Sequence, residues 1–125
     1  MQLTRERAIT LHRRMWRWIG LKTLREKRCV RKEEWFERFG LKTIYSDCYC
    51  CEYARQFFPY SDWRNTRCFY CPIDWGVKRD CCGEGALFKL WCHEIDMENW
   101  QEAGKLALQI VELPEKEELH SERII

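Results

Sequence analysis

The sequence contains no long apolar run and no segment that resembles a secretory signal. A helix that spans a bilayer needs roughly 20 mainly apolar residues in succession, so the sequence predicts no membrane span. The first residues are rich in arginine, and no apolar stretch there precedes a small-residue cleavage site. We therefore expect a cytoplasmic protein with reduced cysteines. The odd number of cysteines, nine, agrees with this expectation, since disulfides alone would leave one thiol over.

The sequence also lacks the motifs of common catalytic sites. It has no glycine-rich phosphate-binding loop, no His-Glu-x-x-His, and no His-x-Glu followed by Pro-Cys-x-x-Cys. Pro72 follows a cysteine pair instead of preceding one. Glu52, beside Cys51, is the single candidate for the base of an open catalytic zinc site. We therefore expect no enzymatic activity and assign no catalytic residue.

Hydrophobic residues make up 46% of the 125 residues, which is enough to bury a core in a single domain. The charges are distributed unevenly. Residues 1–42 carry thirteen Lys or Arg and five Glu, whereas residues 43–125 carry nine Lys or Arg and fifteen Asp or Glu. A basic block of this kind attracts nucleic acid or an acidic protein surface, or it docks against the acidic part of its own chain.

The first third of the chain has the pattern of two helices. Apolar residues recur at three- and four-residue steps over residues 4–28, which predicts a long amphipathic helix. A second, short helix is predicted over residues 32–39, with Gly40 as its C-terminal stop. Together these helices form a basic helical arm over residues 1–42.

The central residues 43–85 have a less regular pattern. β-branched residues predict an extended segment over residues 41–47, and a short helix is predicted over residues 52–58. Turn-forming residues dominate residues 59–85, and so much irregular backbone needs an anchor, for which a metal ion is sufficient. We expect a small irregular module stapled by zinc, with one short β-hairpin as an option.

The last third of the chain is predicted to be helical again. Residues 86–91 form a brief apolar segment, and Asp96 is the expected N-cap of a final helix that Pro114 ends. The C-terminal helical part thus covers residues 86–114, and residues 115–125 form an acidic tail that we expect to be frayed. The predicted fold class is mainly α, in a single domain.

Two Cys-x-x-Cys pairs, with sixteen residues between them, give the strongest signal in the sequence. Each pair turns two sulfurs toward a common point, and two pairs form the tetrahedral thiolate cage that zinc prefers. We predict a closed, structural zinc site with the ligands Cys48, Cys51, Cys68 and Cys71. Other ligand sets stay open. One Cys-x-x-Cys pair, which we call a knuckle, could be replaced by other ligands, or other ligands could complete a site for a second ion. These alternative ligands are Cys50, Cys81, Cys82, Cys92 and His93. An iron–sulfur cluster is a weaker alternative, since the spacing matches no ferredoxin pattern.

Aromatic residues and arginines predict a surface for a macromolecular partner. The chain has seven Trp, five Tyr and six Phe, and we expect those inside the two cysteine knuckles to point outward. Aromatic rings combined with arginine suit both stacking on single-stranded nucleic acid and protein interfaces, and the sequence does not separate the two. The predicted partner-binding residues are Arg13, Arg14, Arg17, Arg25, Arg28, Tyr49, Trp63, Arg64, Arg67, Phe69 and Tyr70.

Several motifs carry a resemblance to a known group of proteins. They are Cys-Tyr-Cys-Cys-Glu-Tyr-Ala at residues 48–54, Cys-Phe-Tyr-Cys-Pro-Ile-Asp-Trp at 68–75, the helix at 100–114, and Leu-His-Arg-x-Met-Trp-x-Trp-Ile at 11–19. Over nearly its whole length the chain resembles small cysteine-rich, mostly uncharacterised proteins encoded by bacteriophages and prophages of Firmicutes. The resemblance implies zinc binding, a phage context and hence the cytoplasm of a bacterial host, and it implies no known activity.

These observations favour a small zinc-binding protein that acts by stoichiometric binding to a macromolecular partner, such as an inhibitor of a host or defence protein. The alternative is a nucleic-acid-binding zinc module, in which the basic helix contacts phosphates and the aromatic side chains of the knuckles stack on bases. No membrane partner is expected.

Overall fold

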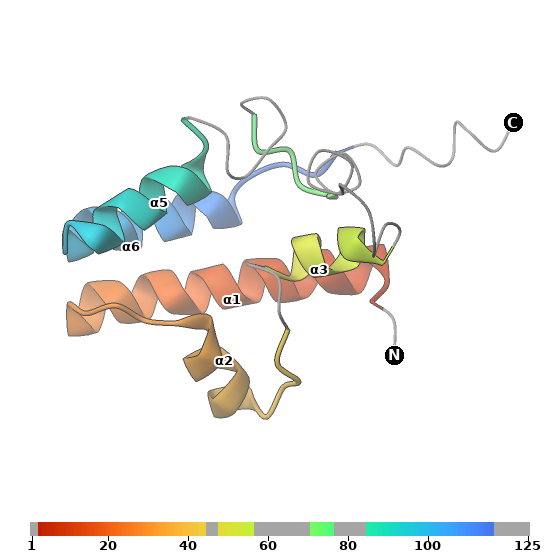
Figure 1. Ribbon diagram of the computed structural model, residues 1–125, viewed down its shortest axis with the longest axis horizontal. Coiled ribbons are helices and arrows are strands. Elements are labelled where there is room, and N and C mark those ends of the chain that lie inside the picture. Colours follow the sequence, from red (N-terminus) through yellow and green to blue (C-terminus); the bar gives the residue numbers. More distant parts are fainter. Residues whose placement is uncertain (1–2, 45–47, 57–70, 77–84, 117–125) are drawn as a thin grey trace, which may run out of the picture.

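The structure is a computed structural model that describes residues 3–44, 48–56, 71–76 and 85–116 (Figure 1). Within these residues the chain is mainly helical, as the sequence predicts, and it forms no strand. None of the helices described is both long and apolar enough to cross a membrane. The helices are α1 (Arg5–Glu26), α2 (Lys32–Phe39), α3 (Tyr49–Arg55), α5 (Leu87–Asp96) and α6 (Trp100–Val111).

The long helix α1 contacts α2, α3 and α6. Its first turn is capped by Thr4, whose hydroxyl oxygen accepts a hydrogen bond from the Arg7 amide at 3.1 Å. It ends at Glu26, because Lys27 adopts a left-handed conformation with φ of 54°. The helix predicted over residues 4–28 is therefore confirmed to within two residues at each end. Its buried residues are Ala8, Ile9, Leu11, His12, Met15, Trp16, Ile19, Gly20 and Thr23.

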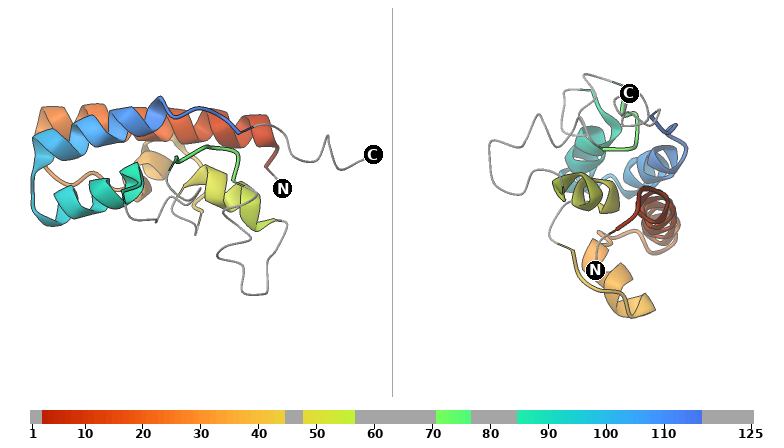
Figure 2. Two further views of the ribbon diagram at one scale, coloured as in Figure 1. Left: turned by 90° about the horizontal axis from the view of Figure 1, so that it is seen from above. Right: turned by 90° about the vertical axis from the view of Figure 1, so that its right-hand side faces the viewer.

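Helix α6 runs beside α1 in the opposite direction (Figure 2). The two helices approach each other closely where each has a glycine, because a glycine places no side chain between the backbones. A Cβ atom on Gly104 would lie 2.5 Å from Leu24 Cγ, and one on Gly20 would lie 2.9 Å from Leu108 Cδ2. The buried residues of α6 are Ala103, Gly104, Leu106, Ala107 and Ile110.

The boundary between α5 and α6 differs from the prediction. The sequence suggests one helical turn over residues 86–91 and an N-cap at Asp96, but α5 continues to Asp96 as a ten-residue helix. Helix α6 starts at Trp100, with Asn99 as its N-cap. The expected start was wrong because Glu98 takes a positive φ of 59°, which places the break between the helices three residues later.

Helix α5 is joined to α1 by aromatic contacts. The Trp16 ring meets Phe88 edge-on, with ring centroids 6.0 Å apart, and meets Trp91 edge-on at 4.9 Å. The rings of Phe88 and Trp91 stack on each other at 5.8 Å. Edge-to-face and stacked pairs of this kind add to the stabilisation that burial provides. They connect α5 to the core although none of its residues is fully buried.

Helices α2 and α3 also lie against α1 (Figure 2). Helix α2 has the predicted bounds, and Gly40 ends it with a left-handed φ of 63°. Helix α3 begins at Tyr49, three residues before the short helix predicted over residues 52–58, so that prediction of its start was wrong. The first residues of α3 are apolar and buried, and their packing moves the start of the helix back to Tyr49. Cys48, whose backbone is in a β conformation, is the N-cap.

Residues 71–76 of the central segment are joined to the residues that follow α6. The Asp74 amide donates to the Pro114 carbonyl at 2.9 Å, and the Lys116 amide donates to the Pro72 carbonyl at 2.8 Å. One isolated antiparallel bridge accompanies these bonds, so the described part of this segment contains a bridge and no β-hairpin. The rest of the predicted module lies outside the described residues, at 45–47, 57–70 and 77–84.

Two arginines of α1 bind the acidic residue that follows α6. The Arg5 and Arg13 guanidinium groups lie 3.3 and 3.5 Å from the Glu115 carboxylate, and Arg13 also donates to the Leu113 carbonyl at 3.0 Å. The sequence left open whether the basic helix docks against the acidic part of its own chain. Through Arg5 and Arg13, which pair with Glu115, α1 does so. The frayed tail predicted for residues 115–125 lies outside the described residues from 117 onward.

Candidate functional site

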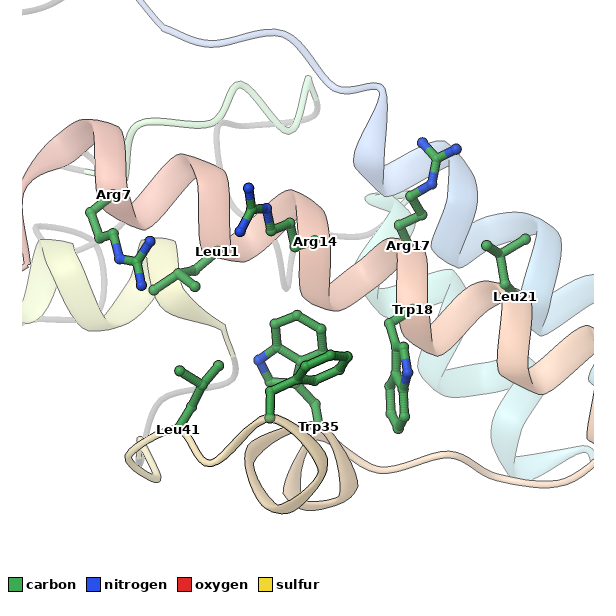
Figure 3. A pocket seen from close by; sticks show the side chains of 9 residues that line it. Arg7, Leu11, Arg14, Arg17, Trp18, Leu21, Trp35 and Leu41 are labelled. Carbon is green, nitrogen blue, oxygen red and sulfur yellow. The ribbon is translucent and has the colours of Figure 1, made fainter.

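A pocket of about 400 Å³ lies between α1 and α2 (Figure 3). One wall comes from α1, which presents apolar and basic residues in alternation along this side. The other wall comes from α2 and from Leu41, which follows it. We call this pocket the α1–α2 groove, and it is lined by Arg7, Leu11, Arg14, Arg17, Trp18, Leu21, Trp35, Phe39 and Leu41.

Three aromatic rings form the floor of the α1–α2 groove. The centroids of Trp18 and Trp35 lie 6.0 Å apart, and Trp18 meets Phe39 edge-on at the same distance. Trp35 and Phe39 are closer, at 4.5 Å. Because the rings pack against one another, the floor is a preformed apolar surface. Leu21 and Phe39 remain 47% exposed, which leaves two large apolar side chains open to a partner.

Cations partly cover the ring faces of this floor. The Lys22 ammonium lies 5.3 Å from the centre of the Trp18 ring, and the Arg38 guanidinium lies 5.2 Å from the centre of Phe39. These are cation–π contacts within the protein. One face of the Trp18 ring and one face of the Phe39 ring are therefore engaged within the protein.

Three arginines line the α1 side of the α1–α2 groove. Arg7, Arg14 and Arg17 are exposed, and none forms an ion pair within the residues that the structure describes. Figure 3 shows the three side chains spaced along α1. They give one side of an apolar groove a run of positive charge, which favours a partner with negative charge beside its apolar residues.

The other described arginines that the sequence predicts as partner-binding residues lie near carboxylates of the protein itself, at different distances. Arg13 is paired with Glu115, and Arg28 forms a two-pronged ion pair with Glu34 at 2.7 and 2.9 Å. This pair holds the Glu34 pKa at about 2, chiefly through the hydrogen bonds from Arg28. Arg25 is 68% exposed and lies 3.8 Å from Glu26.

The expectation that Tyr49 points outward is wrong. Its side chain is only 3% exposed, and its hydroxyl oxygen accepts a hydrogen bond from the Trp35 indole at 3.0 Å. This contact joins α3 to α2 and buries the ring against Phe36. Tyr49 therefore supports the α1–α2 groove from behind. The remaining predicted partner-binding residues, Trp63, Arg64, Arg67, Phe69 and Tyr70, lie outside the described residues.

A cluster of buried thiols lies between α3 and the segment at residues 71–76. Cys48, Cys50, Cys51 and Cys71 are at most 6% exposed, and none forms a disulfide. The Cys48 thiol interacts with those of Cys50 and Cys51, and Cys50 interacts in turn with Cys71. Contacts with neighbouring thiols and burial raise the pKa of Cys48 well above its usual value, and burial does so for Cys50. We call these four residues the thiol cluster.

His12 lies beside the thiol cluster and was not anticipated as a site residue. Its side chain is 0% exposed, and neither ring nitrogen has a hydrogen-bond partner within the described residues. Burial is the main reason that its pKa falls to about 3, and the nearby Cys51 thiol opposes this shift. The edge of the ring meets Trp75 at 5.9 Å. The sequence did contain a signal for the burial of this residue, because His12 lies on the apolar face of the predicted amphipathic helix.

The structure tests the predicted zinc ligands only in part. It brings Cys48, Cys51 and Cys71 into one buried cluster, together with the alternative ligand Cys50. As their side chains are placed, no group of three or more His, Cys, Asp or Glu among the described residues has the arrangement of a metal site. Cys92 is half-buried and His93 is exposed, both on α5. The other predicted ligands, Cys68, Cys81 and Cys82, lie outside the described residues.

Comparisons of the chain with protein-family models, with curated proteins and with solved structures found no match. The resemblance to phage-encoded proteins therefore stays a prediction.

Proposed function

We propose that the protein acts by forming a stoichiometric complex with another protein, and that the α1–α2 groove receives an acidic, partly apolar segment of that partner. The observation that carries this proposal is the run of three arginines, none with an ion pair among the described residues, beside an exposed apolar floor. An inhibitor of a host or defence protein in a phage context is the form of this function that the sequence favours. Such an inhibitor needs no catalytic groups.

A protein partner is favoured over nucleic acid by the state of the aromatic rings. Single-stranded nucleic acid is held by bases that stack on open ring faces. In the α1–α2 groove, Trp18, Trp35 and Phe39 pack on one another, and cations lie over two of them. Apolar side chains of a peptide segment can fill the remaining surface, while carboxylates beside them meet the arginines.

The same proposal includes a structural zinc ion in the central segment, in a protein of the bacterial cytoplasm. The support for zinc is the burial of four cysteines from two separate segments in one cluster. A reducing compartment is supported by the six described cysteines, none of which is in a disulfide. The ion would hold the backbone of this segment in shape and would perform no chemistry.

Photo-crosslinking tests the proposed use of the groove. A photoreactive phenylalanine analogue replaces Phe39 inside the groove, or Met97, which is 61% exposed in the turn after α5, as the control. After crosslinking in a bacterial host lysate, we expect position 39 to label a protein segment rich in Asp or Glu and in apolar residues. Labelling of nucleic acid at position 39, or equal labelling at both positions, would refute the proposal.

Charge reversal on purified complexes supplies the matched control. Arg14→Glu together with Arg17→Glu should weaken binding by roughly tenfold, because two rim charges worth up to about 1 kcal/mol each give a loss of up to about 2 kcal/mol. Arg25→Glu changes an exposed arginine of the same helix that does not line the groove, so it should change affinity by less than about threefold. Equal losses in the two variants would mean that the net charge of the protein, and not the groove, drives binding.

A further inference from the structure

We propose that the segment received by the α1–α2 groove is an amphipathic α-helix of the partner, which lies along α1 and carries two acidic residues seven positions apart on the side that faces the groove. This inference rests on the proposed function and deepens it, because it names the secondary structure and the residue spacing of the partner segment. Three features of the groove support it: the repeat of its α1 residues, the apolar surface that α2 leaves open, and the spacing of its arginines.

The α1 residues of the groove follow a regular repeat (Figure 3). Five of them are separated by steps of four, three, four and three residues, namely Arg7, Leu11, Arg14, Trp18 and Leu21. These are the steps of a helix face that packs lengthwise against a second helix. At 1.5 Å per residue, the wall from the first to the last of them is about 21 Å long. A wall of this length and period fits a helix of about four turns.

Helix α2 covers only part of this wall. Its eight residues give it a length of about 12 Å. Its Trp35 and Phe39 rings pack against Trp18, and Leu11 is buried at the bottom of the groove. Leu21 and Phe39 nevertheless remain 47% exposed. The apolar face of an amphipathic helix can cover these two side chains, as in other helix-in-groove complexes.

The arginines of the groove set the spacing of charge on the partner. Arg7 and Arg14 lie on nearly the same side of α1, about 10.5 Å apart along its axis. Both are exposed, and neither forms an ion pair within the described ranges. A partner helix that lies along α1 has the same rise per residue. Two carboxylates seven positions apart therefore meet both arginines, whichever way the partner helix runs.

An extended partner segment does not match this spacing. A strand rises about 3.3 Å per residue, so points 10.5 Å apart are about three residues apart. Side chains three residues apart point to opposite faces of a strand, and only one of the two carboxylates would face the groove. A spacing of two or four residues restores a common face, but it places the carboxylates about 6.6 or 13 Å apart.

The pattern of the partner helix follows from the groove. Between the two acidic residues, an apolar residue three or four positions after the first lies toward Leu41. Further apolar residues, three or four and seven positions after the second, cover Phe39 and Leu21. The other side of the helix faces water and is free in sequence.

Synthetic peptides of about 20 residues and defined pattern test the helix. The first has two Glu seven positions apart, with Leu at the apolar positions given above. The second has the same composition with Glu and Leu in strict alternation, and the third is the first with a central proline, which breaks a helix. Fluorescence anisotropy measures their binding to the full-length protein. We expect the first peptide to bind at least tenfold more tightly than the other two, and its helicity in circular dichroism to rise on binding.

Charge exchange tests the register. Arg14→Glu should weaken binding of the first peptide severalfold, and replacement of one of its two Glu by Lys should restore the affinity. Only one of the two Lys peptides should do so, because only one Glu faces Arg14. Arg25→Glu is the matched control on the same helix and should change the affinity less than threefold, since Arg25 does not line the groove.

The outcomes separate this inference from the proposed function. Equal binding of the three peptides, or no binding of the first, would overturn the helix and leave the proposed groove to the crosslinking at position 39. A dimer of the protein that the first peptide dissociates would overturn the inference by assigning the groove to a second copy. Labelling of nucleic acid at position 39 would overturn the inference and the proposed function together.

Discussion

Replacement of Gly104 by alanine tests the close approach of α1 and α6. The new Cβ atom would lie 2.5 Å from Leu24 Cγ, 2.6 Å from Leu24 Cδ2 and 3.2 Å from the Gly20 carbonyl oxygen. Overpacking of this kind costs about 1–3 kcal/mol, because helix or side chain must shift. Alanine is favoured over glycine within a helix by about 1 kcal/mol, which offsets part of that cost. We expect Gly104→Ala to lower the free energy of unfolding by about 1 kcal/mol.

Urea unfolding followed by tryptophan fluorescence measures this change, and a double-mutant cycle identifies its cause. Leu24→Ala removes the atoms that the new methyl group meets, so Gly104→Ala should cost nothing, or should stabilise, in the Leu24→Ala background. The coupling between the two sites should be about 1–2 kcal/mol. Gln109→Ala, at an exposed position of the same helix, is the control and should change stability by less than about 0.5 kcal/mol. A Gly104→Ala variant that is more stable than the wild type, or additive effects in the cycle, would refute the proposed contact.

Three further changes test other parts of the structure. Tyr49→Phe should cost about 1–3 kcal/mol in urea unfolding, because it leaves the buried Trp35 indole without its acceptor, and an unchanged stability would contradict this. Glu34→Gln should cost about 1 kcal/mol at pH 7, where the 30% exposure of Glu34 limits the value of its pair with Arg28. Because the Glu34 pKa is lowered in the folded protein, the ionised carboxylate stabilises the fold above pH 4.5. The difference in unfolding free energy between wild type and variant should therefore vanish as the pH falls toward 2. A difference that does not depend on pH would argue against the ion pair. Gly40→Ala should cost about 1 kcal/mol in thermal or urea unfolding through its left-handed φ alone, since no atom lies within 4 Å of the added Cβ, and a neutral result would show that α2 ends differently.

The helices that the sequence predicts well are those with strong local signals. The apolar period of α1 and the glycine stop of α2 are properties of the local chain, so both helices appear close to their predicted bounds. The boundary between α5 and α6 depends instead on the positive φ of Glu98, a residue that rarely adopts it, and no local pattern announces this.

The candidate sites depend on contacts between distant residues, and for this reason the sequence predicts them less completely. Cysteine spacing identifies Cys48 and Cys51 as neighbours, but it contains no information about α1, so His12 was missed. Arg14 and Arg17 were predicted from charge alone. The apolar floor beside them arises only when α2 folds back onto α1 and brings Trp35 next to Trp18.

The central position of α1 has a consequence for any attempt to divide the molecule. Its residues cover α3, α6 and the aromatic side of α5, and they also form one wall of the α1–α2 groove. A fragment that contains only residues 43–85 would therefore lose the surface that shields Cys50 and its neighbours from water. Unlike an autonomous zinc finger, this cysteine-rich stretch cannot be excised or transplanted without the helix that precedes it.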